Sequence, residues 1–492
     1  MTLMTILCPS VRNSRILVVF HVDFCKNLTN SFDYSDPLTI FAGETNKHTM
    51  LLRATFRNIL SFKEETQISF VAGKSTLHPG HVFRAEKRDD ISVLKSGIIY
   101  GANASGKSNV IKAISIIQEI ALGRFPLYRI EPFKLSSGDD TVSKIEVEFK
   151  VDAKFYAYGL EFSLQGIKEE WLFEVNSRSE KAIFTRKADA ETVYDFGTVS
   201  GGASVSQLLK FLAHGTPRDK SFLSEYVLRN GVGLDAIKNA YSWFAARLQI
   251  IFPDTRYQGL TYQVESDNVI QQSTKSLLEF FNTGIYDIRR FPVKLEEAEV
   301  PIEILKDMIS KGRPGNTIVI STPQNTVLYY LEIGADGQYR LSKQRAVHLG
   351  EGNQEVVFEM NQESDGSLRL LDFIPMLLDL RSNPRVYLVD EIDRSMHPML
   401  SKKLMECYYE SLNADRDTQL ICTTHESNLL DLNLLRADEV WFVEKDKGGA
   451  SHLTSLAEYK PREDVQKGYP QHYLASYLGI TPVSLSRIRA RT

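Results

Sequence analysis

Eight consecutive residues have the types and spacing of a phosphate-binding loop. They are Gly101-Ala-Asn-Ala-Ser-Gly106-Lys107-Ser108, and the pattern of two glycines followed by lysine and serine is that of a P-loop. The glycines let the backbone curl so that successive N–H groups point inward toward an anion. Lys107 can reach the β- and γ-phosphates of a nucleotide, and the Ser108 hydroxyl can ligate Mg²⁺. The expected nucleotide-binding set is Gly101, Asn103, Ala104, Ser105, Gly106, Lys107, Ser108 and Asn109.

A second motif could complete the chemistry. Arg385-Val-Tyr-Leu-Val-Asp390-Glu391 is an apolar run that ends in two carboxylates, which is the form of a Walker B strand. Asp390 would hold Mg²⁺ through its water shell, and Glu391 would orient or deprotonate the attacking water. The alternative is a buried strand that meets solvent at an acidic turn, and the presence of a P-loop in the same chain favours the first interpretation.

Two further candidates lie at the ends of predicted elements. The apolar run 418–424 is followed by His425, which at the carboxyl edge of a parallel sheet could contact the γ-phosphate as a sensor. Residues 363–369 precede the apolar helical run 370–380, and small residues at a helix N-terminus can form a second anion site. A capped surface turn, with Ser364 or Asp365 as the N-cap, is the alternative there.

The elements that position these residues follow from the apolar periodicity. Ser96–Tyr100 predicts a strand before the loop, and Asn109–Ile120 has apolar residues at helical spacing after it. Strand, loop and helix together are the context that turns the loop pattern into a phosphate site, because the helix N-terminus adds partial positive charge.

The composition bounds the class of protein. At 492 residues and 43% hydrophobic content the chain can bury a large core, and its net charge of −4 argues against a surface uniformly coated with basic residues. The four cysteines are scattered and form no zinc pattern, which fits a reducing cytosol. No apolar run reaches the length of a membrane span. A cytoplasmic protein without a membrane partner is therefore expected.

The remaining sequence predicts an α/β protein built from several parts. Residues 1–49 read as an atypical N-terminal extension. Residues 50–200 would form the first half of the core, with the P-loop and an antiparallel β subdomain, because 144–151, 155–162 and 169–175 alternate apolar and polar residues. Helical periodicity around 206–212, 242–250 and 276–281 predicts an inserted helical subdomain over 201–320. The second half of the core would cover 321–469, and 470–492 would form a separate tail fragment.

In their order along the chain these motifs resemble the ABC-type ATPases of the SMC/RecF kind, and more narrowly the stand-alone bacterial ATPases of the AbiL/RloA abortive-infection group. The resemblance covers about residues 50–469 and rests on the P-loop, Glu363-Ser-Asp-Gly-Ser367, Asp390-Glu391, Asp393-Arg-Ser-Met-His-Pro398 and Thr423-Thr-His-Glu426. It implies an ABC-type ATPase head that uses ATP and Mg²⁺, with Glu391 and His425 as catalytic residues and Ser108 and Asp390 as metal ligands.

The resemblance also implies partners. Ser364 and Gly366 would bind the γ-phosphate of ATP held by a second subunit, and Asp393 would lie in the loop that crosses between subunits. Two copies would then form an isologous homodimer around two ATP molecules. A role in anti-phage defence, exerted through an effector protein such as a nuclease encoded nearby, is implied as well.

The C-terminal residues depart from this pattern. Pro470 interrupts the family tail after Gln466-Lys-Gly-Tyr469, and Leu474–Arg489 instead resembles the helix-turn-helix of Crp/Fnr-type regulators over about 20 residues. So short a match favours a fused gene fragment over a working DNA reader.

Two other functions stay open. The first is an ATP-dependent DNA-binding clamp of the RecF/SMC type, acting in DNA repair or regulation. The second is a nuclease with its own effector centre, which is disfavoured because no second acidic metal cluster follows Trp441. Glu391 favours hydrolysis over a pure clamp, because a clamp without turnover needs no base.

Overall fold

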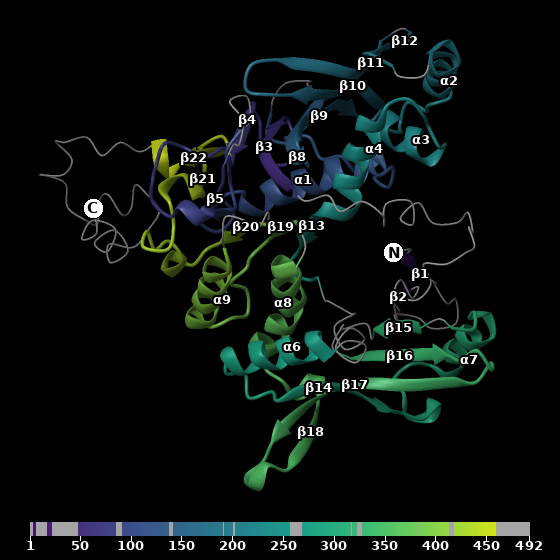
Figure 1. The fold of residues 1–492 in the computed structure, drawn as a ribbon, viewed down its shortest axis with the longest axis vertical. Helices are drawn as coiled ribbons and strands as arrows, with labels where there is room; N and C mark the ends of the chain where they lie inside the picture. The colour runs from purple at the N-terminus through teal and green to yellow at the C-terminus, as the bar shows by residue number, and fades with distance from the viewer. Residues whose placement is uncertain are drawn as a thin grey trace, which may run out of the picture. The chain divides into compact units, whose positions relative to one another are not determined.

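The computed structural model describes residues 3–5, 17–21, 48–84, 91–136, 141–189, 191–199, 202–255, 268–315, 317–321, 327–382, 384–412 and 418–458 (Figure 1). The chain divides into two compact units. The smaller comprises Met1–Ser35, Asp254–Leu378 and Ser395–His397, and the larger Asp36–Pro253, Asp379–Arg394 and Pro398–Thr492. The predicted tail fragment, 470–492, lies outside the described residues. Within the described segments, no helix is both long and apolar enough to cross a membrane.

The larger unit contains a six-stranded sheet that is mostly parallel. Its order is β13 (Leu248–Ile251), β19 (Val386–Val389), β20 (Gln419–Thr424), β7 (Ser96–Tyr100), β21 (Val440–Lys445) and β22 (Ser451–Ser455), and β22 is the strand that runs antiparallel to its neighbour. Strands β7, β19 and β20 are buried along their whole length, as expected for a parallel sheet covered on both faces. The carboxyl ends of β7, β19 and β20 therefore share one edge, with β20 in the middle.

A second sheet of this unit is antiparallel. Its order is β12 (Thr192–Phe196), β11 (Glu180–Ala188), β10 (Gly166–Val175), β9 (Lys154–Ser163), β8 (Ser143–Val151), β3 (Thr49–Arg57) and β4 (Thr66–Ser69). The alternation along β8 places Ile145, Val147 and Phe149 in the core. The predicted antiparallel meander is confirmed and continues through β11 and β12. A short pair, β5 (Val82–Phe83) and β6 (Val93–Leu94), lies outside both sheets.

Helix α1 (Lys107–Ala121) contributes to the core of this unit. Val110, Ile111, Ile114 and Ile117 are buried on its inner face, and the helix contacts β8 and β20. Figure 1 shows it beside β3 and β8. Each such aliphatic side chain contributes about 1.5–3 kcal/mol on burial, so the N-terminus of α1 is held firmly. Among the described residues of this unit, further α-helices are α2 (Gly202–His214), α3 (Phe222–Leu228), α4 (Asp235–Ser242) and α9 (Pro398–Ser411).

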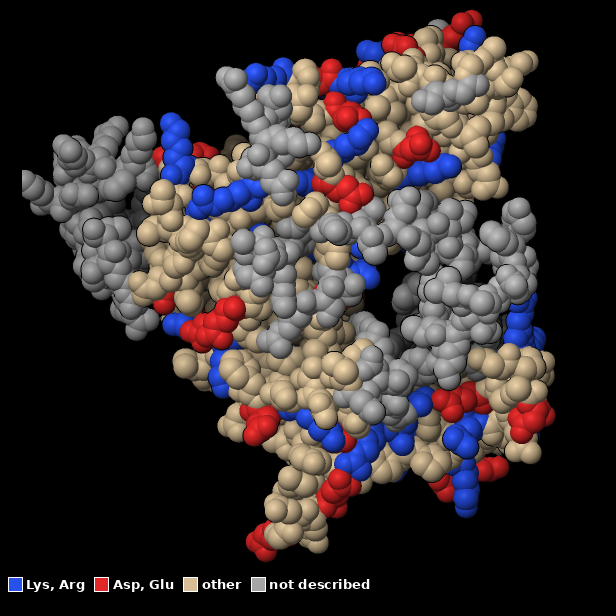
Figure 2. All heavy atoms as spheres, in the orientation of Figure 1, with Lys and Arg blue, Asp and Glu red and all other residues tan. Residues whose placement is uncertain are grey.

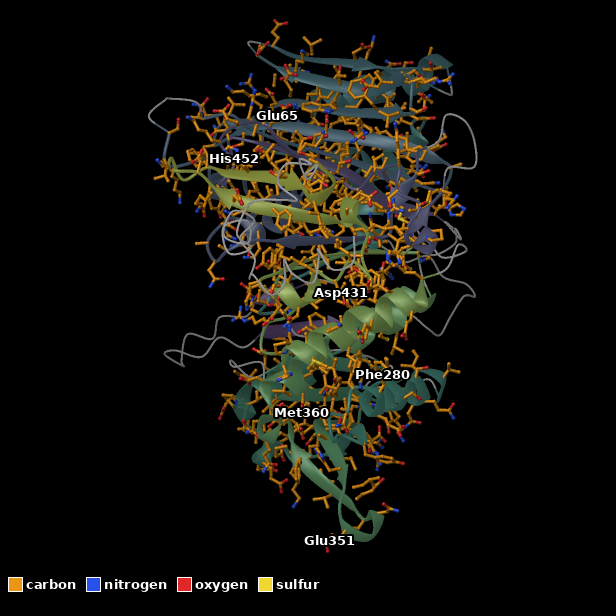
Figure 3. The ribbon with its side chains drawn as sticks, turned by 90° about the vertical axis from the view of Figure 1, so that its left-hand side faces the viewer. Glu65, Phe280, Glu351, Met360, Asp431 and His452 are labelled. Atoms are coloured by element: carbon orange, nitrogen blue, oxygen red, sulfur yellow. The ribbon has the colours of Figure 1, made fainter. Side chains whose placement is uncertain are left out.

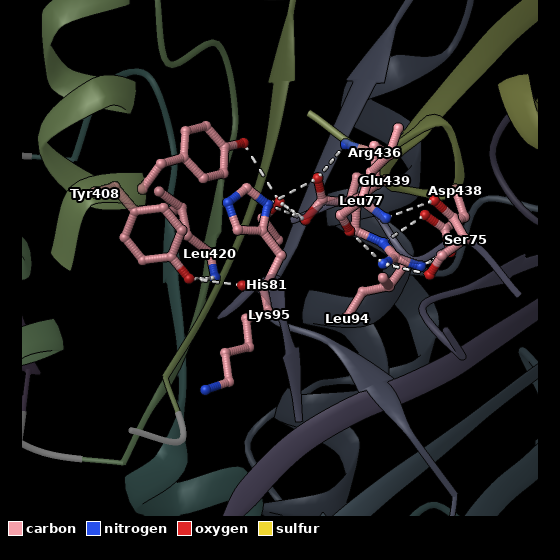
Figure 4. Close-up of polar contacts among 12 residues, drawn as sticks. Ser75, Leu77, His81, Leu94, Lys95, Tyr408, Leu420, Arg436, Asp438 and Glu439 are labelled. Atoms are coloured by element: carbon pink, nitrogen blue, oxygen red, sulfur yellow. Dashed lines mark hydrogen bonds and ion pairs between the residues drawn. The ribbon is translucent and has the colours of Figure 1, made fainter. Parts of the chain in front are cut away.

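A buried polar network fixes the start of β7 (Figure 4). Glu439 is fully buried, and its carboxylate accepts a hydrogen bond from Ser96 Oγ at 2.7 Å and lies 3.0 Å from His81 Nδ1. Tyr408 OH donates to the carbonyl of Lys95 at 2.6 Å. Since a buried carboxylate is costly without partners, these contacts hold β7 in one position relative to α9 and β21.

The smaller unit is built on an antiparallel sheet. Its order is β1 (Leu3–Thr5), β2 (Leu17–His21), β15 (Thr317–Ser321), β16 (Leu328–Ile333), β17 (Tyr339–Leu349) and β14 (Asp287–Pro292), and β18 (Glu355–Glu359) also pairs with β17. The helices are α6 (Asn268–Phe280), α7 (Ile302–Lys311) and α8 (Asp365–Ser382), of which the part to Leu378 lies in this unit. Leu305 and Met308 of α7 share a core with Ile318, Tyr329 and Leu331 of the sheet.

Basic side chains of this sheet pair with acidic ones. Arg289 contacts Asp287 and Glu355, and Lys343 lies 2.9 Å from Glu359. On the face shown in Figure 2, basic and acidic side chains of the described residues are interspersed.

The unit boundaries differ from those expected from local periodicity. Residues 201–320, the expected helical insertion, also contain β13, β14 and β15, and the units divide them at Pro253 and Asp254. The expected helix at 242–250 ends in a π-helical turn, Trp243–Arg247, because Leu248–Ile251 pairs in parallel with β19. Part of the expected extension forms β1 and β2, and β2 pairs with β15. The conformation of these segments is set by pairing with strands that are distant in the sequence. Local apolar periodicity contains no information about such pairing.

Candidate functional site

The loop between β7 and α1 has the backbone that its glycines predict. Gly106 has a φ of 110° and Ala104 a φ of 62°, so the chain passes twice through the left-handed region before the helix begins at Lys107. A Cβ at Gly101 would lie 2.4 Å from the carbonyl oxygen of Val443. Both predicted glycines are thus required, one for close approach and one for conformation.

Lys107 is the cation of this loop. Its Nζ donates hydrogen bonds to the carbonyl oxygens of Gly101, at 2.8 Å, and Ala102, at 2.9 Å. Burial lowers the pKa of Lys107, and the nearby carboxylates Asp393, Glu391 and Asp390 act in the opposite direction. The structure therefore brings the lysine of the first motif together with the carboxylates of the second, although they lie far apart in the sequence.

Hydrogen bonds among Ser61, Asn109 and Ser451 fix the position of the loop. Ser451 Oγ donates to the carbonyl of Ser105 at 2.6 Å and contacts Ser61 Oγ at 2.8 Å. Asn109 Nδ2, from the first turn of α1, donates to the same Ser61 Oγ at 2.8 Å. The sequence gives no signal for Ser451, a single serine outside any motif, and does not indicate the role of Ser61. Asn103 and Ala104 are exposed, and Ser108 is half-buried.

Asp390 and Glu391 leave the end of β19 in different ways. Asp390 is 2% exposed, and Thr423 Oγ1 of β20 donates to its Oδ1 at 2.6 Å. Glu391 has a φ of 51°, and its backbone N–H donates to the same Thr423 Oγ1 at 2.7 Å. Its side chain is partly exposed to solvent, and Glu391 Oε2 lies 3.4 Å from Nη1 of Arg394. Thr423 thus orients a buried carboxylate and an accessible one, a role that the Thr423-Thr-His-Glu426 motif did not by itself indicate.

His425 follows β20 and lies beside Asp393. His425 Nδ1 is 2.6 Å from Asp393 Oδ2, and the aspartate side chain is buried while the imidazole is half exposed. Asp393, His425 and Glu426 could together ligate a cation, because their ligand atoms lie within 4.8 Å of one another. The expected place of Asp393, in a loop crossing to a second subunit, stays a prediction. In this chain Asp393 contacts its own His425.

Ser364 and Gly366 belong to the smaller unit, at the start of α8. Ser364 Oγ accepts a hydrogen bond from the N–H of Ser367 at 3.1 Å, so Ser364 caps the helix. A Cβ at Gly366 would lie 3.0 Å from the carbonyl oxygen of Ser395. Ser364 is exposed. Both sequence interpretations are compatible with this geometry, since a capped N-terminus is also a place where anions bind.

A P-loop at the carboxyl end of β7, an acidic pair at the end of β19 and a helix that begins at the loop lysine define a P-loop domain of the ATPase class. The sequence model of the family described as "AAA domain, putative AbiEii toxin, Type IV TA system" matches residues 98–431. This range is more than half of the 492 residues, and the chain belongs to that family.

Other comparisons are more distant. A search of curated proteins finds no match. Among solved structures, an Smc head bound to the C-terminal winged-helix domain of ScpA is similar at 14% identity, covering 82% of this chain and 97% of that one, with a TM-score of 0.38. An SMC head domain from Thermotoga maritima has 14% identity, coverages of 82% and 98% and a TM-score of 0.34. A Pyrococcus furiosus Smc head bound to the C-terminal domain of ScpA has 14% identity, coverages of 83% and 97% and a TM-score of 0.35.

Proposed function

We propose that the chain is an Mg²⁺-dependent ATP hydrolase. The observation that carries this proposal is the environment of Lys107, whose Nζ is held by two backbone carbonyls next to the carboxylates of Asp390, Glu391 and Asp393. Carbonyl oxygens are neutral acceptors, so the phosphate groups of ATP are better partners for this cation.

The residues present also fit a magnesium ion. Ser108 and Asp390 would hold it, because hydroxyl and carboxylate oxygens are the hard ligands that Mg²⁺ takes. Asp390 is suited to this role by its burial and by the Thr423 hydroxyl that fixes Oδ1. Bound with ATP, the ion would neutralise charge on the β- and γ-phosphates.

Glu391 is the residue that we propose activates water. Unlike Asp390, its carboxylate is accessible, and its backbone is held by Thr423 in a left-handed conformation. Such a conformation costs a residue other than glycine on the order of 1–3 kcal/mol and is characteristic of functional sites. His425, half exposed beside the same sheet edge, would sense the γ-phosphate.

We propose further that two copies dimerise around two ATP molecules. Ser364 and Gly366 offer a second helix N-terminus to a triphosphate, and one phosphate cannot easily satisfy two such ends of one chain from opposite sides. ATP would join the copies, and hydrolysis would loosen them by removing the group that both contact. The dimer would control a partner effector in anti-phage defence, in keeping with the resemblance to abortive-infection ATPases and with the description of the family.

A mixing experiment tests the shared sites. A Lys107→Ala chain and a Ser364→Arg chain, each inactive alone, are combined and their ATP hydrolysis is measured. Shared sites leave one intact composite site in each mixed dimer, so about half of the activity per dimer should return. Mixed dimers that form but hydrolyse no ATP would refute the sharing of sites between copies.

A further inference from the structure

The signature turn, Glu363–Ser367, is joined to the hairpin formed by β17 and β18 through one side-chain contact. His348 Nε2 lies 2.6 Å from Glu363 Oε1. The side chain of His348 is 20% exposed and that of Glu363 only 6%. Glu363 directly precedes Ser364, so this contact acts on the first residue of the turn.

The hairpin is a well-defined support for this contact. β17 and β18 pair without interruption from Arg345 opposite Glu359 to Leu349 opposite Glu355. The ring of His348 packs against that of Phe358, with centroids 4.5 Å apart. In Figure 3, Glu351 lies at the far end of the hairpin and Met360 at its base, where Met360 is buried.

Between β18 and α8 the chain has little freedom. The side chain of Gln362 accepts from the N–H of Glu359 at 2.8 Å, and the N–H of Glu363 donates to the carbonyl of Met360 at 3.2 Å. After Glu363 the helical pattern begins, since the N–H of Leu368 donates to the carbonyl of Ser364 at 2.9 Å. The position of Ser364 is therefore set from one side by α8 and from the other by Glu363.

We propose that His348 is a positioning residue for the signature turn and acts through Glu363. This inference rests on the proposed function, in which Ser364 and Gly366 meet the ATP of a second copy. A carboxylate as buried as Glu363 needs a partner, and His348 supplies an N–H donor. Without that donor the carboxylate turns toward water and displaces the turn. A displacement of about 1 Å at a site of this kind costs on the order of 100-fold in rate.

The test compares matched substitutions of His348 in the full chain. His348→Phe keeps a ring against Phe358 but removes the donor, whereas His348→Gln restores an N–H that can reach the carboxylate. Lys311→Met removes an exposed ion pair with Asp307 in the same unit and is the control for loss of charge. Light scattering measures ATP-dependent dimerisation in a Glu391→Gln background, and steady-state kinetics measure kcat and KM in the chain with Glu391 intact.

His348→Phe should lower dimerisation and kcat by about 30- to 100-fold, while the affinity of the monomer for ATP stays within about twofold. His348→Gln should recover most of the loss, and Lys311→Met should behave like the wild type. If folded His348→Phe protein dimerises and turns over ATP normally, the inference is overturned.

Two further outcomes distinguish the role of His348 from the existence of the ATP-dependent dimer. If His348→Phe does not fold, Glu363→Met replaces it. The methionine side chain has a similar length but no acceptor for His348, so a loss of kcat at unchanged ATP affinity supports the inference, and full activity overturns it. If the wild-type chain itself shows no ATP-dependent dimer, the proposed dimer fails, and with it the role assigned to His348.

Discussion

Replacing Gly106 by alanine should cost the P-loop about 3–4 kcal/mol. At a φ of 110°, a residue with a Cβ pays about 1–2 kcal/mol. The new Cβ would lie 2.2 Å from Ser451 Oγ and 2.7 Å from Ser61 Oγ, so both hydroxyls must move. Their movement breaks the hydrogen bonds of Ser451 to Ser105 and to Ser61, at about 1 kcal/mol each. If the substitution destabilises the phosphate-binding conformation of the loop by this amount, the affinity for ATP drops by roughly 100- to 1,000-fold.

Isothermal titration with ATP and Mg²⁺ measures the loss of ATP affinity. Thermal unfolding measures how much of the roughly 3–4 kcal/mol instead lowers the stability of the folded protein. Gly337→Ala is the matched control, because Gly337 has a φ of 76° with nothing within 4 Å of the added Cβ. Gly337→Ala introduces only the backbone strain of a positive φ, without steric overlap, and should keep its affinity for ATP.

A double substitution separates strain from steric overlap. Adding Ser451→Ala to Gly106→Ala removes the oxygen that the Cβ would meet first, so the two changes together should cost less than their sum. Unchanged ATP affinity and stability in Gly106→Ala would refute the assignment of this loop conformation to phosphate binding.

The remaining predictions concern the lysine, the acidic pair and the C-terminus. Lys107→Ala should abolish ATP binding in an equilibrium assay, because the lost cation faces three phosphates; binding equal to wild type would show that the site is misassigned. Glu391→Gln should bind ATP yet lose on the order of 100-fold or more in turnover, with the ATP-bound dimer accumulating on gel filtration; normal hydrolysis would move the catalytic role to another residue. Deleting residues 471–492 should leave ATPase activity unchanged in a steady-state assay, since the resemblance to the ATPase family ends near Tyr469; specific DNA binding that disappears on this deletion would favour the DNA clamp instead.

Much of the site could be predicted because its residues stand in short local patterns. The glycines, Lys107 and the acidic pair each occur within a few residues of an apolar strand. A strand followed by such residues forms a motif from which their chemical role can be inferred. Ser451 belongs to no pattern, and Thr423 stands in the Thr423-Thr-His-Glu426 motif, which does not indicate its contacts. Thr423 matters because β20 lies between β7 and β19, and Ser451 because β22 folds back beside the loop, and neither arrangement is visible in local sequence.

The fold could be predicted where elements pair with their neighbours in sequence. Strands β8, β9 and β10 are joined by short turns, and their alternation was sufficient. Local periodicity assigns β13 to the end of a helix, because its four residues are largely apolar and follow a helical run. Its strand conformation comes from pairing with β19, more than a hundred residues later, and a short buried strand cannot be told from a helix by periodicity alone.

The strand order of the parallel sheet has a consequence for how the protein is made. β7, which carries the P-loop, pairs with β20 and β21, so neither of its neighbours exists until residues 419–445 have been translated. At about 10 residues per second, roughly half a minute separates the synthesis of β7 from that of its first partner. The antiparallel sheet needs no such wait, because β3 and β8 to β12 are all complete by residue 196. During that interval an apolar strand on the ribosome has no edge to join, and we expect a nascent chain stopped before residue 419 to bind no ATP and to require a chaperone.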